Sequence, residues 1–245
     1  NSDKAGSSVD AIGDFNNDGI DDFVIGAKGA SGGGDTRGES YVVFGASNLG
    51  SGASLSIATF NGTNGFQMNG VADSDQSGFR VAGGADVNGD GISDLIVGSL
   101  GSDSYAGRAY LVFGGSGVGS GGSLSLSALN GTTGYIIKGE SGSSYTGQTI
   151  DLIGDINGDD IADILIGAPR NNADEGRGYV IFGGSHLATL DDGTPGSRDG
   201  IILLSDLAGG AAATVSFLTM VRTKTIPAGR FPAPATSMVT VLPTC

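Results

Sequence analysis

Short runs of apolar residues, bounded by glycine, recur along the chain. In the second of three similar stretches these runs predict four strands, at about 79–84, 94–99, 108–113 and 135–139. The stretches before and after it show the same order of runs, and no segment has the 3.6-residue period of an amphipathic helix. The pattern therefore predicts an all-β chain of short antiparallel strands.

The three stretches are copies of one unit of about 70 residues. Equivalent loops begin at Asp14, Asp86 and Asp155, and equivalent strands end at Phe44, Phe113 and Phe182. Four strands copied at a fixed period match a β-propeller blade better than a sandwich, whose strands do not recur as a set. A parallel β-helix is a second candidate, but its repeats are much shorter. We expect units near residues 3–70, 71–139 and 140–208.

The composition of the chain excludes several classes of binding partner and of chemical site. Glycine supplies 47 of the 245 residues, which indicates many tight turns, and the formal net charge is −14. An acidic surface repels nucleic acid and anionic membranes, whereas metal cations are its natural counter-charge. The only cysteine is Cys245, so an internal disulfide and a zinc cluster are excluded. No apolar stretch is long enough for a transmembrane segment.

A nine-residue loop between the first two strands of each unit has side-chain oxygens at positions 1, 3, 5 and 9. A main-chain carbonyl at position 7 would add one more of the six to eight oxygens that calcium takes. We predict one Ca²⁺ site in each loop, about three ions in all. The predicted ligands are Asp14, Asn16, Asp18, Ile20 and Asp22 in the first loop, Asp86, Asn88, Asp90, Ile92 and Asp94 in the second, and Asp155, Asn157, Asp159, Ile161 and Asp163 in the third.

Two other interpretations of these loops fit the sequence less well. An EF-hand needs a glutamate at position 12, where this chain has Ile25, Val97 and Ile166. Asp and Asn can also form side-chain-to-backbone turns without a metal, but three copies would crowd like charges with nothing to relieve them. Asp160 stands where the other loops have glycine, at a position expected to need a positive φ, so we expect the third site to be the weakest.

These residues resemble the FG-GAP repeat of integrin α chains and of many bacterial surface and secreted proteins. Phe44-Gly45, Phe113-Gly114 and Phe182-Gly183 supply the first half of the motif, and Ile166-Gly167-Ala168-Pro169 the second, with weaker copies at 25–27 and 97–99. The resemblance covers about residues 3–207. It implies a seven-bladed propeller with structural calcium, exposed outside the cell and used for adhesion or recognition of a protein or carbohydrate ligand. Only the calcium-loop residues carry over from it.

At about 70 residues per unit, the chain holds little more than three blades, so we expect a partial propeller whose remaining blades lie in the parent protein. No enzyme is expected. His186 has no copy in the other units, and no serine lies in a Gly-x-Ser-x-Gly elbow. The alternative function is an accessory propeller of a secreted hydrolase, such as a phospholipase-type enzyme. A third possibility is a structural repeat array in an adhesin.

Arg37, Arg108 and Arg177 precede the third strands, and we expect them to make structural contacts within the repeat. The pattern ends near residue 209, and 209–245 is predicted to be an out-of-frame or disordered tail. Codons can be chosen that encode another acidic loop and that, read one nucleotide late, give residues 229–244.

Overall fold

The computed structural model describes residues 3–30, 36–49, 51, 54–140, 142–171, 175–191, 199–207 and 215–218. Three sheets each contain a set of four antiparallel strands, hydrogen-bonded one to the next. The first is β1 (Ala5–Gly13), β2 (Asp22–Ala27), β3 (Glu39–Val43) and β4 (Gly65–Asn69); the second is β5 (Ser77–Ala85), β6 (Asp94–Ser99), β7 (Arg108–Val112) and β9 (Gly134–Lys138); the third is β10 (Thr149–Ile153), β11 (Asp163–Ala168), β12 (Arg177–Ile181) and β14 (Val215–Leu218).

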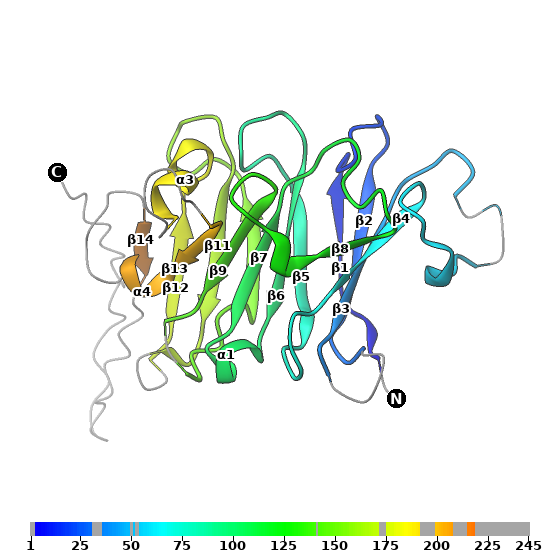
Figure 1. Cartoon of the computed structure of the whole chain (residues 1–245). Helices are drawn as coiled ribbons and strands as arrows, with labels where there is room; N and C mark the ends of the chain where they lie inside the picture. Colours follow the sequence, from blue (N-terminus) through cyan, green and yellow to red (C-terminus); the bar gives the residue numbers. More distant parts are fainter. Residues whose placement is uncertain are drawn as a thin grey trace, which may run out of the picture.

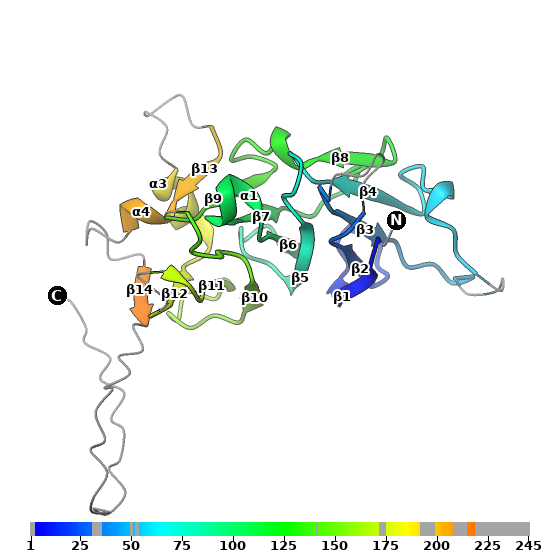
Figure 2. The same ribbon diagram turned by 90° about the horizontal axis from the view of Figure 1, so that it is seen from below.

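The sheets stand side by side as three blades (Figure 1). The first strands of the blades, β1, β5 and β10, lie along one side of the row, and β4 and β9, the fourth strands of the first two blades, lie toward the other (Figure 2). The prediction of an all-β partial propeller is therefore confirmed. The four strands predicted for the second unit agree with β5, β6, β7 and β9 to within two residues at each end.

A fifth strand extends the first two sheets. β8 (Ser123–Ser125), from the second unit, pairs in parallel with β4 of the first blade. β13 (Ile201–Leu203), from the third unit, pairs in the same way with β9 of the second. A helical turn follows each of them, η2 (Leu126–Ala128) and α4 (Leu204–Leu207), and η1 (Ile57–Thr59) is the equivalent turn in the first unit. The segment between the third and fourth strands thus reaches back to the preceding blade.

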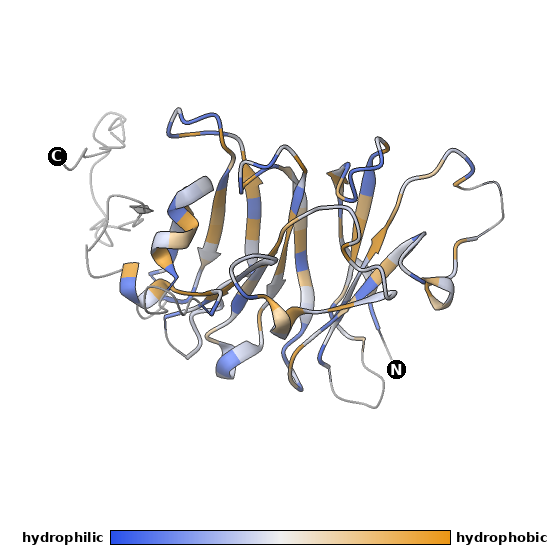
Figure 3. Cartoon of the chain, turned by 45° about the horizontal axis from the view of Figure 1, so that its top comes forward, coloured by the Kyte–Doolittle hydropathy of each residue, from blue (hydrophilic) through white to orange (hydrophobic). Residues whose placement is uncertain are grey.

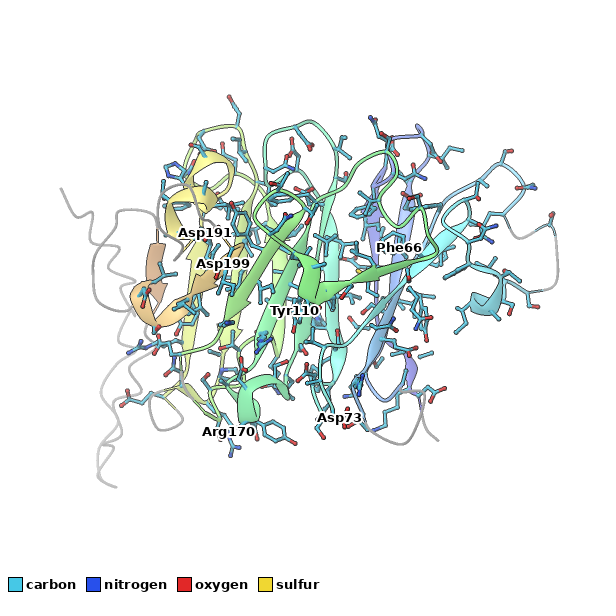
Figure 4. The ribbon with its side chains drawn as sticks, viewed as in Figure 1. Phe66, Asp73, Tyr110, Arg170, Asp191 and Asp199 are labelled. Carbon is cyan, nitrogen blue, oxygen red and sulfur yellow. The ribbon has the colours of Figure 1, made fainter. Side chains whose placement is uncertain are left out.

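The core lies between the blades. One cluster of buried side chains fills the space between the first and second blades and includes Phe66 and Tyr110 (Figure 4). Another fills the space between the second and third. Because side chains alternate along a strand, Leu95 and Val97 join the first cluster and Ile96 joins the second. Figure 3 shows that apolar residues are concentrated along the strands and polar residues in many of the loops.

Neighbouring blades approach each other closely at the glycine that the motif places near the end of each second strand. A Cβ atom on Gly26 would lie 2.3 Å from the carbonyl oxygen of Gly78, and one on Gly98 would lie 2.2 Å from that of Gly147. Both distances are far below any tolerated contact, so a side chain at either position would push two blades apart.

The three arginines form ion pairs, as expected, but they are not equivalent. Arg108 binds Asp103 within the second blade, and Arg177 in the third blade binds Glu140, which follows the last strand of the second. In the strand register, Arg108 and Arg177 occupy the position that Glu39 takes in the first blade. Arg37 lies two residues earlier and forms its ion pair with Asp73.

The remaining short elements are α1 (Ser102–Tyr105), η3 (Gly184–His186) and α3 (Leu187–Leu190). Asp191 follows α3, and its carboxylate accepts hydrogen bonds from the main-chain N–H groups of Asp199 and Gly200, which lead into β13 (Figure 4). None of the helices in the described ranges is long and apolar enough to cross a membrane.

Strand β14 lies inside the range predicted to be a tail. It pairs with β12 at the place that β4 and β9 take in the other blades, so the third blade extends past residue 208 to Leu218. The rest of the predicted tail lies outside the described residues.

Candidate functional site

The three acidic loops lie at one edge of the blades, at the top of Figure 1. Each connects the first strand of a blade to the second: 14–21 joins β1 to β2, 86–93 joins β5 to β6, and 155–162 joins β10 to β11. The predicted ligands of each site are therefore brought into one loop, and the three loops are brought to the same edge of the molecule.

The first five positions of each loop form a set of tight turns. The carboxylate of Asp14 accepts hydrogen bonds from the N–H groups of Asp18 and Gly19, at 2.9 and 2.8 Å. Asn16 accepts from the N–H of Asp18, and Asp18 accepts from that of Ile20. The same hydrogen bonds recur in the second and third loops. The side chains of positions 3, 5 and 1 accept from the N–H groups of positions 5, 7 and 6. The turn contacts considered in the sequence analysis are thus present in every loop.

Position 6 has the left-handed backbone that was expected. The φ angle is 90° at Gly19, 84° at Gly91 and 66° at Asp160. Glycine adopts this conformation without strain, whereas a side chain raises its energy, although aspartate tolerates it better than most residues.

Position 9 differs from the others because its side chain is buried. Asp22 is 2% exposed, and Asp94 and Asp163 are fully buried. In each loop one carboxylate oxygen accepts from the N–H of position 2, at 2.8 to 3.0 Å. The other oxygen accepts from the N–H of the glycine in the Phe-Gly pair, at 2.8 Å for Gly45, 2.9 Å for Gly114 and 3.1 Å for Gly183. This aspartate therefore ties the loop to the end of the third strand.

This contact explains why the residue after the phenylalanine is glycine. A Cβ atom at Gly45, Gly114 or Gly183 would lie 2.2 to 2.3 Å from a main-chain carbonyl oxygen just before the second strand. Only glycine allows the N–H to approach the buried carboxylate. The pair is recognisable in the sequence as a motif, but this role is not, because the aspartate that accepts the hydrogen bond lies about 20 residues away in the chain.

The buried carboxylates have altered acidity. Burial first, and the nearby charges of Asp90 and Asp86 second, raise the pKa of Asp94 to about 7, against the lowering effect of its two N–H donors. Burial also raises the pKa of Asp22. In contrast, hydrogen bonds from loop N–H groups, that of Asp160 first, lower the pKa of the exposed Asp155.

The loops offer the oxygen donors that a hard cation prefers, but their side chains point elsewhere. Within the described residues, no group of three or more Asp, Glu, His or Cys side chains converges on a point that could hold a metal ion. The side-chain oxygens at positions 1, 3 and 5 accept hydrogen bonds from loop N–H groups, and the Asn16 amide N–H donates to the Asp18 carboxylate at 2.9 Å. A bound ion would require these side chains to turn toward it. The ligand assignment remains a prediction.

The next blade covers the first two loops, whereas no described residue covers the third in the same way. The carbonyl of Phe15 accepts from the N–H of Gly115, and that of Val87 accepts from the N–H of Gly184, both at 2.8 Å. Phe15 and Val87 are fully buried, whereas Ile156 at the same position of the third loop is 57% exposed. A loop is thus completed by the blade that follows it.

Comparison with known families matches these three units. The family model of the FG-GAP repeat matches residues 5–43, 77–112 and 147–181. The chain carries three FG-GAP repeats. Each matched segment of the FG-GAP model runs from the first strand of a blade to its third and contains the acidic loop. No curated protein gives a significant match to the chain.

The FG-GAP repeat is typically a non-enzymatic unit. The histidine, His186, lies in η3, where its ring contacts that of Phe182 at a centroid distance of 6.5 Å. This contact packs the turn after the third strand, which agrees with a structural role for the residue.

Proposed function

We propose that this FG-GAP propeller module binds calcium in its three acidic loops and recognises a protein or carbohydrate ligand outside the cell. Propeller modules with this repeat are often involved in adhesion or ligand binding. The observation that carries the proposal is the threefold recurrence of one loop geometry, with three carboxylates at ligand positions in each copy.

Electrostatics supports a divalent cation in each loop. Positions 1, 5 and 9 place like charges within a single tight turn, and the carboxylate at position 9 is removed from water. Calcium accepts flexible geometry and six to eight oxygens, so carboxylates at these positions, the amide of position 3 and the carbonyl of position 7 suit it. The ion would neutralise the loop and hold its turns against the start of the second strand.

The affinity expected of these loops suits an extracellular location, which is part of this proposal. We expect weak calcium affinity, because the loop carboxylates must first give up the hydrogen bonds that they accept from loop N–H groups. Sites of this kind in extracellular modules bind calcium in the range of about 10⁻⁴ to 10⁻³ M. Such sites fill outside the cell, where calcium is abundant.

Isothermal titration of the full chain with calcium tests the proposal. We expect about three sites and a rise in melting temperature. Calcium at 100 times the dissociation constant of one site adds about 2.7 kcal/mol to the stability of the folded state. Asp90→Asn should remove one site while leaving an oxygen to accept the N–H of Ile92. Asp206→Asn, outside the loops, is the matched control. Flat heats at millimolar calcium would contradict the proposal.

A further inference from the structure

Two tyrosines and an arginine form a cluster at the edge of the molecule opposite to the acidic loops, where Figure 4 labels Arg170. Tyr105 lies in α1, and Tyr145 lies in the segment between β9 and β10. Their ring centroids are 5.6 Å apart. The Arg170 guanidinium lies 4.8 Å from the centroid of the Tyr145 ring and donates to the Tyr145 hydroxyl at 2.9 Å. We call these three residues the aromatic platform.

The backbone under the platform recurs between the first and second blades, but the side chains do not. The N–H of Tyr145 donates to the carbonyl of Tyr105 at 3.0 Å, and the N–H of Gln76 donates to the carbonyl of Thr36 at the same distance. The φ angle is 59° at Tyr145 and 55° at Gln76. The repeat therefore fixes the backbone here without requiring an aromatic ring. The equivalents of the three platform residues are Thr36, Gln76 and Gly101.

The turn that carries Tyr105 is strained and firmly held. Asp103, Ser104 and Tyr105 have left-handed φ angles of 52°, 58° and 69°, which are unfavourable for residues with a Cβ atom. The Asp103 carboxylate accepts two hydrogen bonds from Arg108, at 2.5 and 2.6 Å, and Ser102 at the start of the turn is fully buried. Tyr105 is nevertheless 41% exposed. Strain of this kind accumulates where a side chain is held ready for a ligand.

The size of the platform suits a sugar ring better than a protein surface. Among the large apolar side chains that the described ranges expose, Tyr105 is the only one in the loops of this edge. A stable protein interface buries about 800 Å² on each partner, and two partly exposed rings supply much less. A pyranose ring of the gluco configuration has an apolar face of axial C–H groups, about as wide as one tyrosine ring, and a rim of hydroxyl groups.

Polar groups that can bind such a rim surround the two rings. Both tyrosines carry a hydroxyl, and the guanidinium of the exposed Arg170 offers N–H donors. The Asp103 side chain is 40% exposed and can accept, and Ser104 beside it is exposed. Aromatic surface with a few fixed polar groups is typical of sites for small ligands.

We propose that the aromatic platform binds a β-linked saccharide of the gluco configuration. One sugar ring stacks on Tyr105 and Tyr145, and its hydroxyl groups bond to Arg170 and to the neighbouring polar side chains. This inference rests on the recognition part of the function proposed above and names its site and its ligand class. The platform is built by the second and third blades, so it involves neither end of the chain.

Isothermal titration of the full chain with two tetrasaccharides, β-1,4-linked glucose and β-1,4-linked N-acetylglucosamine, tests the proposal. We expect one site for at least one of them, with a dissociation constant of about 1 mM, which suits a ligand held mainly through one ring. The β-1,4-linked galactose tetramer is the matched ligand. It should bind about 10-fold more weakly, because its axial hydroxyl interrupts the apolar face.

Substitutions distinguish the platform from other surfaces. Tyr105→Ala and Tyr145→Ala should each weaken binding by about 10-fold, because each removes a stacking ring. Tyr105→Phe keeps the ring and should stay within about 3-fold of the unchanged chain. Gln76→Ala is the matched control, since Gln76 has the same backbone at the other junction and should leave binding unchanged. Thermal unfolding shows whether each variant keeps its fold.

Calcium titration of the same samples separates this inference from the proposal about the loops. Calcium heats without saccharide binding would contradict the platform alone, and saccharide binding without calcium heats would contradict the loops alone. Flat heats with both gluco-configured tetramers at about 10 mM, equal binding of the galactose tetramer, or Tyr105→Ala without effect would each overturn the platform as a saccharide site.

Discussion

The second and third acidic loops have nearly the same sequence and the same hydrogen bonds, yet they differ in their surroundings. Position 2 is fully buried at Val87 and 57% exposed at Ile156. The second loop has a following blade that donates an N–H from Gly184 to Val87, and the third has none among the described residues. The comparison shows that a repeat is completed by its neighbour, as in other repeat proteins, where stability resides largely in the interfaces.

The largest expected loss of stability distinguishes substitutions in a covered loop from those in the uncovered one. Phe15→Ala should lower the free energy of unfolding by about 3 to 5 kcal/mol, because it empties a fully buried site between the first two blades. Ile156→Ala, at the same loop position, should change it by about 0.5 kcal/mol or less. Urea denaturation, at a concentration where the chain does not self-associate, measures both. Equal losses would mean that the following blade does not stabilise the loop.

The next effect concerns the glycine between blades. Gly98→Ala should destabilise the chain by about 1 to 3 kcal/mol, since its Cβ atom would meet the main-chain oxygen of Gly147 at 2.2 Å. Gly167→Ala is the matched variant, because its nearest neighbour is the Thr149 hydroxyl, which can rotate away. Thermal unfolding of the two variants compares them. If Gly167→Ala is as damaging as Gly98→Ala, the close approach of blades is not the cause.

The smallest effect concerns ion pairs within and between blades. Glu140→Gln breaks the pair with Arg177, whose side chains are 14% and 27% exposed, and should cost about 1 kcal/mol. Asp73→Asn breaks the pair with Arg37, where exposure is 61% and 49%, and should cost about 0.2 kcal/mol. The difference should shrink in high salt, because screening acts on exposed charges. A larger loss from Asp73→Asn would reverse this ranking.

Much of the fold follows from the sequence because local signals and the repeat agree. The apolar runs at 94–99 and 108–113 are bounded by glycine and acidic turns, so their strands were predictable without tertiary information. The positive φ of Asp160 was predictable in the same way, from the glycines at equivalent positions.

Other features depend on contacts between units and could not be predicted locally. The segment 123–125 is too short to predict as a strand and becomes one only by pairing with β4. The burial of Asp94 depends on an N–H from Gly114, which follows a different strand. Strand β14 has none of the features of the other fourth strands, which begin with glycine at Gly65 and Gly134, so the sequence pattern placed it in the tail.

The fifth strands have a consequence for the order in which the chain is made. β8 belongs to the second unit but finishes the sheet of the first, so the outer edge of the first blade stays open during synthesis until Ser123–Ser125 has emerged from the ribosome. Open strand edges invite pairing with other chains. A ribosome that stops early therefore does more than omit the later blades: it also leaves the last blade that it has made without the strand that would close its edge.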